Sequence, residues 1–486
     1  MSEDFIQDLQ PELLWKYFYE IAQVPRPSKK EGKIIEHIKN FATRNSLNYK
    51  VDKVGNIVIS IPATKGFEKS PVVVLQGHID MVCEKNKGTK HDFEKDPIKL
   101  LKEDGWVTAD GTTLGGDNGI GVAAALAAGT DKNFTHGPLE ILLTIDEETG
   151  LTGANNLQPG FITGKILLNL DSEEDGAFYV GCSGGIDTAG LFKPDFQEAP
   201  DNKSAYEVLV TGLKGGHSGL DINTGRANAI KLLARSLKAL ENIDFYLAKI
   251  EGGSKRNAIP REAEAIIFVN PSEEKAIAAI LKDIQSDFLN EFNRADNKLK
   301  IEFNKCETDT KRVFTNNFKD KIINVLLSLP HGVVAMSQDI PELVETSTNV
   351  ATITFEGNEI VVGTSQRSSI DSAKKYIAQS VESTFKLSGA IVKTGDGYSG
   401  WKPNLDSKIL KVSKDVFVKL FNKKPEIKAI HAGLECGILG DKFPGLDMVS
   451  FGPTIQGAHS PDERVNIETV GKFYDLLKEI LGEIAG

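Results

Sequence analysis

The chain contains 486 residues, of which 40% are hydrophobic, and carries a formal net charge of −11 at pH 7. This length exceeds what one hydrophobic core usually serves, so we expect two or three domains. The acidic balance excludes nucleic acid and anionic membranes as partners, because no basic excess is present to bind phosphates.

The cysteines and the first residues indicate a cytoplasmic protein. Cys83, Cys182, Cys306 and Cys436 lie far apart without a CxxC pair, which fits a reducing compartment better than a disulfide framework. The N-terminus lacks the basic start and the apolar run of a secretory signal. The longest small-apolar stretch, IGVAAALAAG, is about half the length needed to span a bilayer, so no membrane partner is expected.

Helix and strand patterns alternate in the first part of the chain. We expect helices at 11–24, 30–45 and 118–129 and strands at 49–63, 70–80, 139–147 and 165–171. The continuous apolar runs VVVL, ILLTI and ILLNL are typical of strands buried on both faces of a sheet. They predict an α/β domain with a mixed, largely parallel sheet and helices on both faces.

The pattern changes near residue 186 and changes back near residue 396. Between these points, strands and helices follow in two successive groups, at 206–292 and 298–387. We interpret them as an inserted α+β lid domain, residues 186–395, built of two similar units. Residues 1–185 and 396–486 are then the two segments of one α/β catalytic domain.

Five residues of metal-ligand type follow predicted strands or lie in glycine-rich loops: His78, Asp117, Glu148, Asp171 and His459. Two imidazoles and three carboxylates are the ligand set expected of a pair of divalent ions, most often zinc, that activate water for hydrolysis. Taken singly, each residue has a plainer interpretation, such as a strand-end polar group, a helix cap or a solvated acidic turn.

Two further acids stand beside these positions. His78 and Asp80 are two residues apart on a strand and face the same side, where a carboxylate orients a metal-bound imidazole. Glu147 and Glu148 are adjacent carboxylates, which do not both ionise cheaply without a nearby cation. One of them can bind metal while the other takes a proton from water.

The motifs GHIDMV, GGDNG, DEETG and GAHSPDE, in this order, resemble those of the co-catalytic zinc metallopeptidases. That family includes aminoacylase, carboxypeptidase G, peptidase T and the carnosinase-like dipeptidases. The resemblance extends over nearly the whole chain. It implies that His78 and Asp171 bind one metal, that Glu148 and His459 bind the other, and that Asp117 bridges the two.

The same resemblance implies two zinc ions per chain, with cobalt or manganese as alternatives. It makes Asp80 the orienting carboxylate and Glu147 the general base. It also implies a cis peptide bond after the bridging aspartate, between Asp117 and Asn118.

The resemblance assigns substrate contacts as well. His217 in GGHSG would help to hold the carbonyl oxyanion, Asn257 in GGSKRNAIP would contact substrate, and Arg367 would receive a substrate carboxylate. The loop HAGLECG departs from the Gly-Thr-Asp-Gly type of related peptidases. We assign its Glu435 to the free amino group of the substrate. The plain alternatives for the other three residues are a loop histidine, a turn asparagine and a surface arginine.

We therefore predict a two-metal dipeptidase that hydrolyses unblocked L-dipeptides, including those with C-terminal histidine. The alternative enzyme is an amidase or deacylase of N-acyl amino acids, which would need no acidic receptor such as Glu435. A metal- or peptide-binding protein without catalysis would need neither Asp80 nor Glu147. The partner is a small dipeptide, and monomer and homodimer both remain open, as does whether His217 acts in its own chain.

Overall fold

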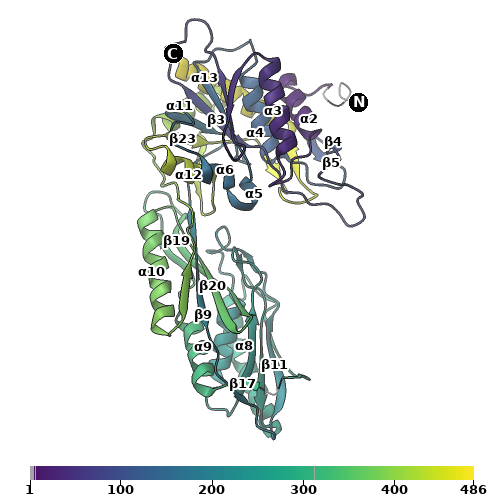
Figure 1. Cartoon of the computed structure of the whole chain (residues 1–486), viewed down its shortest axis with the longest axis vertical. Coiled ribbons are helices and arrows are strands. Elements are labelled where there is room, and N and C mark those ends of the chain that lie inside the picture. The colour runs from purple at the N-terminus through teal and green to yellow at the C-terminus, as the bar shows by residue number, and fades with distance from the viewer. Residues whose placement is uncertain (1–4, 6, 311) are drawn as a thin grey trace. The chain divides into compact units, whose positions relative to one another are not determined.

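The computed structural model describes residue 5, residues 7–310 and residues 312–486, and the chain divides into two compact units. The core unit comprises Met1–Gly181, Trp401–Ala429 and Leu434–Gly486. The insert unit comprises Cys182–Gly400 and Ile430–Gly433. In Figure 1 the core unit contains both the purple N-terminal helices and the yellow C-terminal helix, so its two ends of sequence fold together.

The core unit is built on an eight-stranded sheet with the order β1-β2-β6-β3-β7-β23-β8-β22. These strands are β1 (Asn48–Val51), β2 (Ile57–Ile61), β3 (Val73–His78), β6 (Leu139–Thr144), β7 (Ile166–Asn169), β8 (Ala177–Cys182), β22 (Glu426–Ile430) and β23 (Asp447–Ser450). The four central strands β6, β3, β7 and β23 run parallel, whereas β1, β2 and β8 pair antiparallel. The predicted mixed sheet is confirmed, with its parallel part confined to the centre.

Two of the three apolar runs seen in the sequence form the fully buried strands β3 and β6 of this sheet, and the third forms β7. Every residue of β3 and of β6 is buried. Strands of this kind have no solvent-facing side, which is why their sequences show no alternation.

The helices of the core unit pack on these strands. They are α2 (Glu12–Ala22), α3 (Gly32–Arg44), α4 (Gly116–Ala128), α5 (Glu147–Gly150), α6 (Thr152–Asn156), α11 (Lys408–Phe421), α12 (Glu435–Lys442) and α13 (Ile467–Ala485). Helix α4 lies against β3 and α2, and α11 lies against β23 and α13. Because α4 is packed from several sides, it is apolar almost all round. Among the described residues, no helix combines the length and the apolarity that crossing a membrane would take.

A small antiparallel sheet of the core unit positions the last glycine-rich loop. Its order is β24-β25-β5-β4, with β4 (Leu100–Glu103), β5 (Trp106–Ala109), β24 (Ile455–Gln456) and β25 (Arg464–Asn466). β25 pairs with both β5 and β24. The loop that carries His459 is therefore held at both of its ends.

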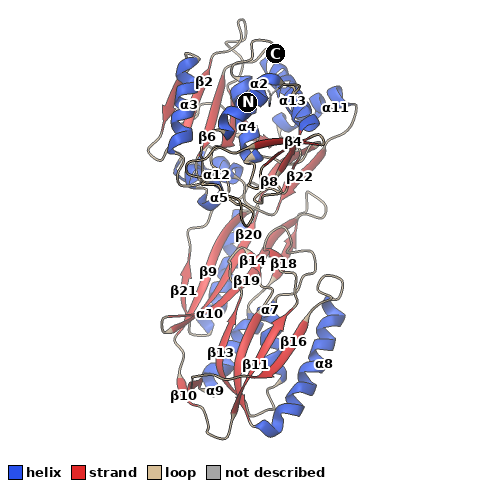
Figure 2. Cartoon of the chain, turned by 90° about the vertical axis from the view of Figure 1, so that its right-hand side faces the viewer, coloured by secondary structure: helices blue, strands red, loops and turns tan. Residues whose placement is uncertain are grey.

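The insert unit contains a second, antiparallel sheet with the order β16-β11-β15-β13-β19-β20-β9-β21, to which β18 adds beside β19. Its strands are β9 (Gly184–Phe192), β11 (Ser204–Thr211), β13 (Tyr246–Gly252), β15 (Ala263–Val269), β16 (Lys300–Lys305), β18 (Gly332–Met336), β19 (Val344–Glu356), β20 (Glu359–Ser368) and β21 (Ile391–Thr394). Figure 2 shows these strands in red. The β13–β19 junction consists of one residue pair, Gly252 with Ile353.

Two short strand pairs complete the unit, namely β10 (Phe196–Glu198) with β17 (Arg312–Phe314) and β12 (Gly216–His217) with β14 (Ala258–Ile259). One strand differs from its predicted place. The segment 298–305 was predicted to open the second α+β group, but β16 pairs with β11 of the first group. The amphipathic pattern that identified this strand says nothing about its partner.

Among the described residues of the insert unit, four helices cover the sheet, and the short 3-10 turn η1 (Pro271–Glu273) precedes α8 (Glu274–Phe292). They are α7 (Ala229–Ala239), α8 (Glu274–Phe292), α9 (Asn316–Ser328) and α10 (Asp371–Leu387). They contact one another in the order α8, α7, α9, α10 and bury a common apolar core against the strands.

A lysine joins two of these helices. Lys231 in α7 donates from its Nζ to the backbone oxygens of Leu326, Leu327 and Leu329, at 2.6, 2.8 and 2.8 Å. These oxygens lie at the C-terminal end of α9, where carbonyls have no partner within the helix and a positive charge is favourable.

We predict that Lys231→Met destabilises the protein. Three partly buried carbonyl groups lose their donor, at a cost on the order of 2 kcal/mol. For a unit of this size, the midpoint of thermal unfolding should fall by roughly 4–8 °C. Lys238→Met is the matched control, because Lys238 lies in the same helix with its side chain 49% exposed and pairs with Glu241 at the surface. An equal midpoint for both variants would contradict the prediction.

Candidate metal centre

The parallel strands bring most of the predicted ligands to one edge of the core sheet. β3 ends at His78, the residues after β6 lead to Glu147 and Glu148, and the residues after β7 lead to Asp171. Parallel strands have their carboxyl ends at the same edge of the sheet, so these side chains meet although they are distant in sequence. Asp117 reaches the same place from the start of α4.

Asp117 lies between the two imidazoles. Its Oδ1 is 3.0 Å from Nε2 of His78, and its Oδ2 is 3.3 Å from Nε2 of His459. Nε2 of His78 is also 3.4 Å from Oδ1 of Asp171, and Nε2 of His459 is 3.0 Å from Oε2 of Glu148. One carboxylate thus faces both halves of the cluster, one oxygen to each side.

These contacts define two groups that share a residue. His78, Asp117 and Asp171 form one, and Asp117, Glu148 and His459 form the other, with the potential ligand atoms of each within 4.8 Å of one another. Imidazole and carboxylate are suitable ligands for zinc and similar ions. In addition, the buried Oε1 of Glu148 has no hydrogen-bond partner among the described residues, as expected of an oxygen that faces a cation. The residues therefore fit a pair of divalent ions.

His459 adopts a backbone conformation that supports this interpretation. Its φ of +63° lies in the left-handed region, which is unfavourable for a residue with a Cβ. Such conformations cost of order 1–3 kcal/mol and gather at functional sites. The imidazole is half-exposed, with 54% of its side-chain surface accessible, yet it points to Asp117 and Glu148.

Asp80 connects the first histidine to the pair of glutamates. Its Oδ1 is 3.3 Å from Nδ1 of His78 and accepts a hydrogen bond from the backbone N–H of Glu147 at 3.1 Å. Its Oδ2 accepts from the N–H of Glu148 and from the hydroxyl of Ser28. Burial alone would raise the pKa of Asp80, but His78, Ser28 and Glu147 outweigh it and lower the pKa to about 2.

A second set of buried acidic residues, Glu31 and Asp146, supports the turn that carries Glu147 and Glu148. Asp146, just before them, has a φ of +48°, and its backbone N–H donates to Glu31 at 3.0 Å. Its own carboxylate accepts from the hydroxyls of Thr149 and Thr152. Glu31 and Asp146 were not predicted from the sequence, because a structural acid in a turn has no distinctive motif.

The electrostatics of the cluster reflect an excess of negative charge. Burial, and then the carboxylates around it, raise the pKa of Glu147 well above its usual value, and burial raises that of Asp171 to about 7. Burial opposes the charge on His78, but Asp171 and Asp117 raise its pKa well above 6.5. Buried carboxylates compete in this way for the few positive charges within reach, and divalent ions would relieve the excess.

Glu435, at the start of α12, is fully buried behind this edge of the sheet. Its Oε2 accepts hydrogen bonds from Nε2 of Gln76 and Oγ1 of Thr144, each at 2.6 Å, while Oε1 has no hydrogen-bond partner among the described residues. Burial raises the pKa of Glu435 to about 7. One oxygen is thus held by β3 and β6 and the other remains available.

In the insert unit, hydrogen bonds determine the tautomer of His217. Its Nδ1 accepts from the backbone N–H groups of Gly219 and Leu220, at 3.2 and 3.0 Å, so the ring proton lies on Nε2. Burial, and then the charge of Arg367, lower the pKa of His217 to about 4. The ring is therefore a neutral donor at physiological pH.

Arg367 on β20 is a buried guanidinium, 7% exposed, without a carboxylate partner among the described residues. Nε lies 3.4 Å from the hydroxyl of Ser218, and Nη1 donates to the hydroxyl of Tyr398 at 3.0 Å. Buried charges are normally paired, so an arginine with only hydroxyl partners indicates a place for an anion.

The side chains beside Arg367 add no negative charge that could pair with its guanidinium. His431, 6% exposed, bonds Ser347 through Nε2 at 2.7 Å. Burial, and then Arg367, lower its pKa to about 3. The exposed Asn257 belongs to the same region, since its backbone oxygen accepts from the N–H of Ser218 next to His217. The insert unit thus brings its three predicted substrate residues together.

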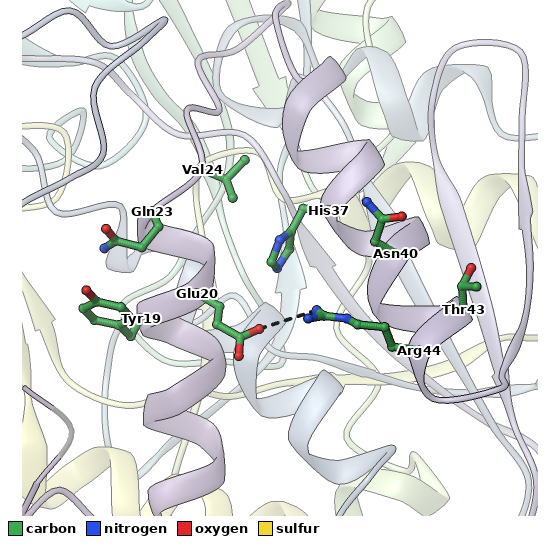
Figure 3. Close-up of a pocket in the computed structure, with 8 residues that line it drawn as sticks. All are labelled: Tyr19, Glu20, Gln23, Val24, His37, Asn40, Thr43 and Arg44. Atoms are coloured by element: carbon green, nitrogen blue, oxygen red, sulfur yellow. Dashed lines mark ion pairs between the residues drawn. The ribbon is translucent and has the colours of Figure 1, made fainter. Parts of the chain in front are cut away.

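A separate hollow of about 590 Å³ lies between α2 and α3 of the core unit (Figure 3). Its lining residues are Tyr19, Glu20, Gln23, Val24, His37, Asn40, Thr43 and Arg44. Glu20 and Arg44 form an ion pair at 3.7 Å beside His37, whose pKa burial lowers. None of the predicted ligand or substrate residues lines this hollow, so it is distinct from the carboxylate cluster.

Comparison with known proteins agrees with the geometry of the core unit. The family model described as Peptidase family M20/M25/M40 matches residues 74–483. The chain belongs to this family. The resemblance predicted from the motifs is confirmed, and with it the prediction of a peptide-bond hydrolase. The peptide between Asp117 and Asn118 of this M20 chain is cis, as the resemblance implies.

Two relatives match the M20 chain over its full length. It is 42% identical to the cytosol non-specific dipeptidase of Escherichia coli strain K12 over 485 residues, which is 100% of this chain and 99% of the relative. The crystal structure of aminoacylhistidine dipeptidase from Vibrio alginolyticus matches with a TM-score of 0.89 and 42% identity, covering 99% of each chain. Aminopeptidase PepT from Bacillus cereus, at 17% identity and a TM-score of 0.56, covers 98% of this chain and 100% of its own, and shares the fold.

We predict that the imidazole of His217 is neutral, with its proton on Nε2, at pH 6. Histidine ¹⁵N NMR should show this tautomer, and the His217→Gln variant identifies the signal. Because the folded pKa of about 4 lies below the unfolded value of about 6.5, this group lowers the free energy of unfolding as the pH falls from 6.5 toward 4. A cationic ring, or a proton on Nδ1, at pH 6 would contradict the prediction.

Proposed function

We propose that the chain is a metal-dependent dipeptidase that hydrolyses unblocked L-dipeptides, including those with C-terminal histidine. The observation that carries the proposal is the pair of ligand groups that share Asp117. Membership of the M20 peptidases and the two relatives named as dipeptidases support it. A dipeptidase must also recognise both charged ends of its substrate, and the chain offers a buried guanidinium and a buried carboxyl group for that purpose.

We assign His78 and Asp171 to one ion, Glu148 and His459 to the other, and Asp117 to both. Zinc suits this set of two imidazoles and three carboxylates, and cobalt or manganese are alternatives. Divalent ions in these positions would lower the pKa of a water and polarise the peptide carbonyl. We assign Asp80 to orienting His78, because its Oδ1 lies 3.3 Å from Nδ1 of the imidazole.

The proton transfers belong to Glu147. Its carboxylate takes a proton from the attacking water while the water oxygen bonds to the peptide carbon. The C–N bond then breaks, and Glu147 delivers the same proton to the leaving nitrogen. The neutral Nε2–H of His217 donates to the carbonyl oxygen as negative charge develops there, which is the role of an oxyanion donor.

The two ends of the substrate are recognised by opposite charges. We assign the C-terminal carboxylate to Arg367, whose guanidinium can bind it bidentately, with Asn257 assisting. We assign the free amino group to Glu435, which retains one unpartnered oxygen. A substrate with both termini free and only two residues offers the two charged groups that these receptors would bind.

We predict that Glu147→Ala abolishes turnover and retains both metals, because Glu147 moves a proton and is not a ligand. Activity should fall by at least about 10²-fold. Glu148→Ala should instead lose metal, because a ligand disappears. Elemental analysis and assays of dipeptide hydrolysis on the two variants test the assignment. Each variant is the control for the other. A metal-free Glu147→Ala with a fully loaded Glu148→Ala would exchange the two roles.

We also predict that blocking either end of the substrate is costly. Amidating the carboxylate or acetylating the amine removes a charge-assisted contact worth on the order of 2–3 kcal/mol, which is roughly 30- to 150-fold in kcat/KM. Tripeptides should likewise be poor substrates. Arg367→Met should reduce the difference in kcat/KM between free and amidated dipeptides.

Arg235→Met is the matched control for the arginine variant. Arg235 lies in the insert unit but pairs with Glu291 at the surface, so its loss should leave the ratio of free to amidated hydrolysis unchanged. Faster hydrolysis of N-acetyl amino acids than of any dipeptide by the unmodified enzyme would replace the proposed function with that of a deacylase.

A further inference from the structure

Glu463 holds the backbone that leads to Asp117. This glutamate is 2% exposed, and its Oε2 accepts from the N–H groups of Leu114 and Gly115, at 2.8 and 2.9 Å. Its Oε1 accepts from the N–H of Asp117 at 3.1 Å. One carboxylate thus binds three backbone donors next to the shared ligand. It also lies four residues after His459, so it joins the loops of two ligands.

Arg26 holds the other side of the same backbone. This arginine is 2% exposed, and its Nη1 donates to the backbone oxygens of Ile79 and Asp80, at 3.2 and 2.7 Å. Its Nη2 donates to the backbone oxygen of Gly115. The guanidinium therefore bridges the segment of His78 and Asp80 to the segment of Asp117.

The glycines of the LGGDNGIG motif make room for this arginine. A Cβ on Gly115 would lie 2.4 Å from Nη2 of Arg26, and a Cβ on Gly119 would lie 2.7 Å from the same atom. Gly115 also has a φ of +69°, in the left-handed region. Any side chain at Gly115 or Gly119 would displace the guanidinium, so these glycines serve the contact with Arg26.

The two side chains also complement each other in charge. Burial lowers the pKa of Arg26, and the carboxylates of Glu463, Asp80 and Asp117 oppose that effect. A buried charge without hydrogen bonds is costly, but here each charge is surrounded by backbone groups of the opposite polarity. Replacing either residue leaves several backbone groups unpaired at the same place.

We propose that Arg26 and Glu463 are positioning residues that hold three ligand segments, those of His78, Asp117 and His459, at the spacing that two metal ions need. The inference rests on the ligand roles proposed above. Neither residue is assigned to touch metal or substrate. They act through the backbone of the ligands, so their loss should weaken metal binding before it weakens the fold.

The test is Co²⁺ binding to Glu463→Gln. An amide keeps the size of the side chain but replaces one acceptor oxygen with a donor, which faces backbone N–H groups and cannot bond them. We expect the affinity for Co²⁺, measured against a competing chelator, to fall by about 10- to 100-fold. The visible absorption of bound Co²⁺ should change as well, because the ligands are displaced.

Two further variants keep the test decisive. Glu463→Asp retains the charge but is too short to reach all three donors, and Arg26→Lys retains the charge but loses the planar fork. Both should weaken Co²⁺ binding while circular dichroism stays that of the unmodified protein. Arg464→Gln is the matched control, since Arg464 is adjacent to Glu463 but contacts Trp106 and Gln456, and it should bind Co²⁺ normally.

Unchanged affinity and absorption in folded Glu463→Gln, Glu463→Asp and Arg26→Lys would overturn the inference. An equal loss of Co²⁺ affinity in Arg464→Gln would also overturn it, because any substitution in this loop would then weaken metal binding. The result is separable from the proposed function. If the unmodified protein binds two Co²⁺ ions but cleaves no dipeptide, the proposed function fails, and the affinities of the variants still decide the positioning role.

Discussion

The core unit depends on holding several buried carboxylates within a few ångströms of one another. Asp80, Asp117, Asp171, Glu147 and Glu148 surround two imidazoles, and burial, with neighbouring carboxylates adding to it, raises the pKa values of Glu147 and Asp171. On flexible loops, the mutual repulsion of these carboxylates would drive them apart. The cluster persists because buried parallel strands supply rigid ends, and backbone N–H groups bind the oxygens that do not face the centre.

The insert unit shows the complementary arrangement. Arg367 is buried among hydroxyl groups and two imidazoles that it helps to keep neutral. A centre of excess negative charge and a centre of excess positive charge therefore occur in separate units of one chain. Burying either kind of charge without a partner costs free energy, and either centre could bind a substrate group of opposite charge. The ammonium and the carboxylate of an unblocked dipeptide are groups of these two opposite charges.

Much of the core unit could be predicted because its signals are local. The apolar runs identified β3, β6 and β7, and the acids that follow them lie at the sheet edge where the candidate ligands meet. The neighbour of a strand in the sheet could not be predicted where the paired strands are far apart in sequence, as for β16 and β11. Arg26 and Glu463 gave no signal of their role either, because they bond backbone groups, which are the same in every sequence. The tautomer of His217 likewise depends on two N–H groups of the following turn.

The order of the ligands along the chain has a consequence for how the protein is made. His78, Asp117, Glu148 and Asp171 precede the whole insert unit, whereas His459 follows it. During synthesis, the N-terminal residues are the first to leave the ribosome. A growing chain therefore holds one ligand group long before the second can form. The five ligands that we propose are therefore all present only after the insert unit has been translated, and a chain interrupted before His459 lacks one of them.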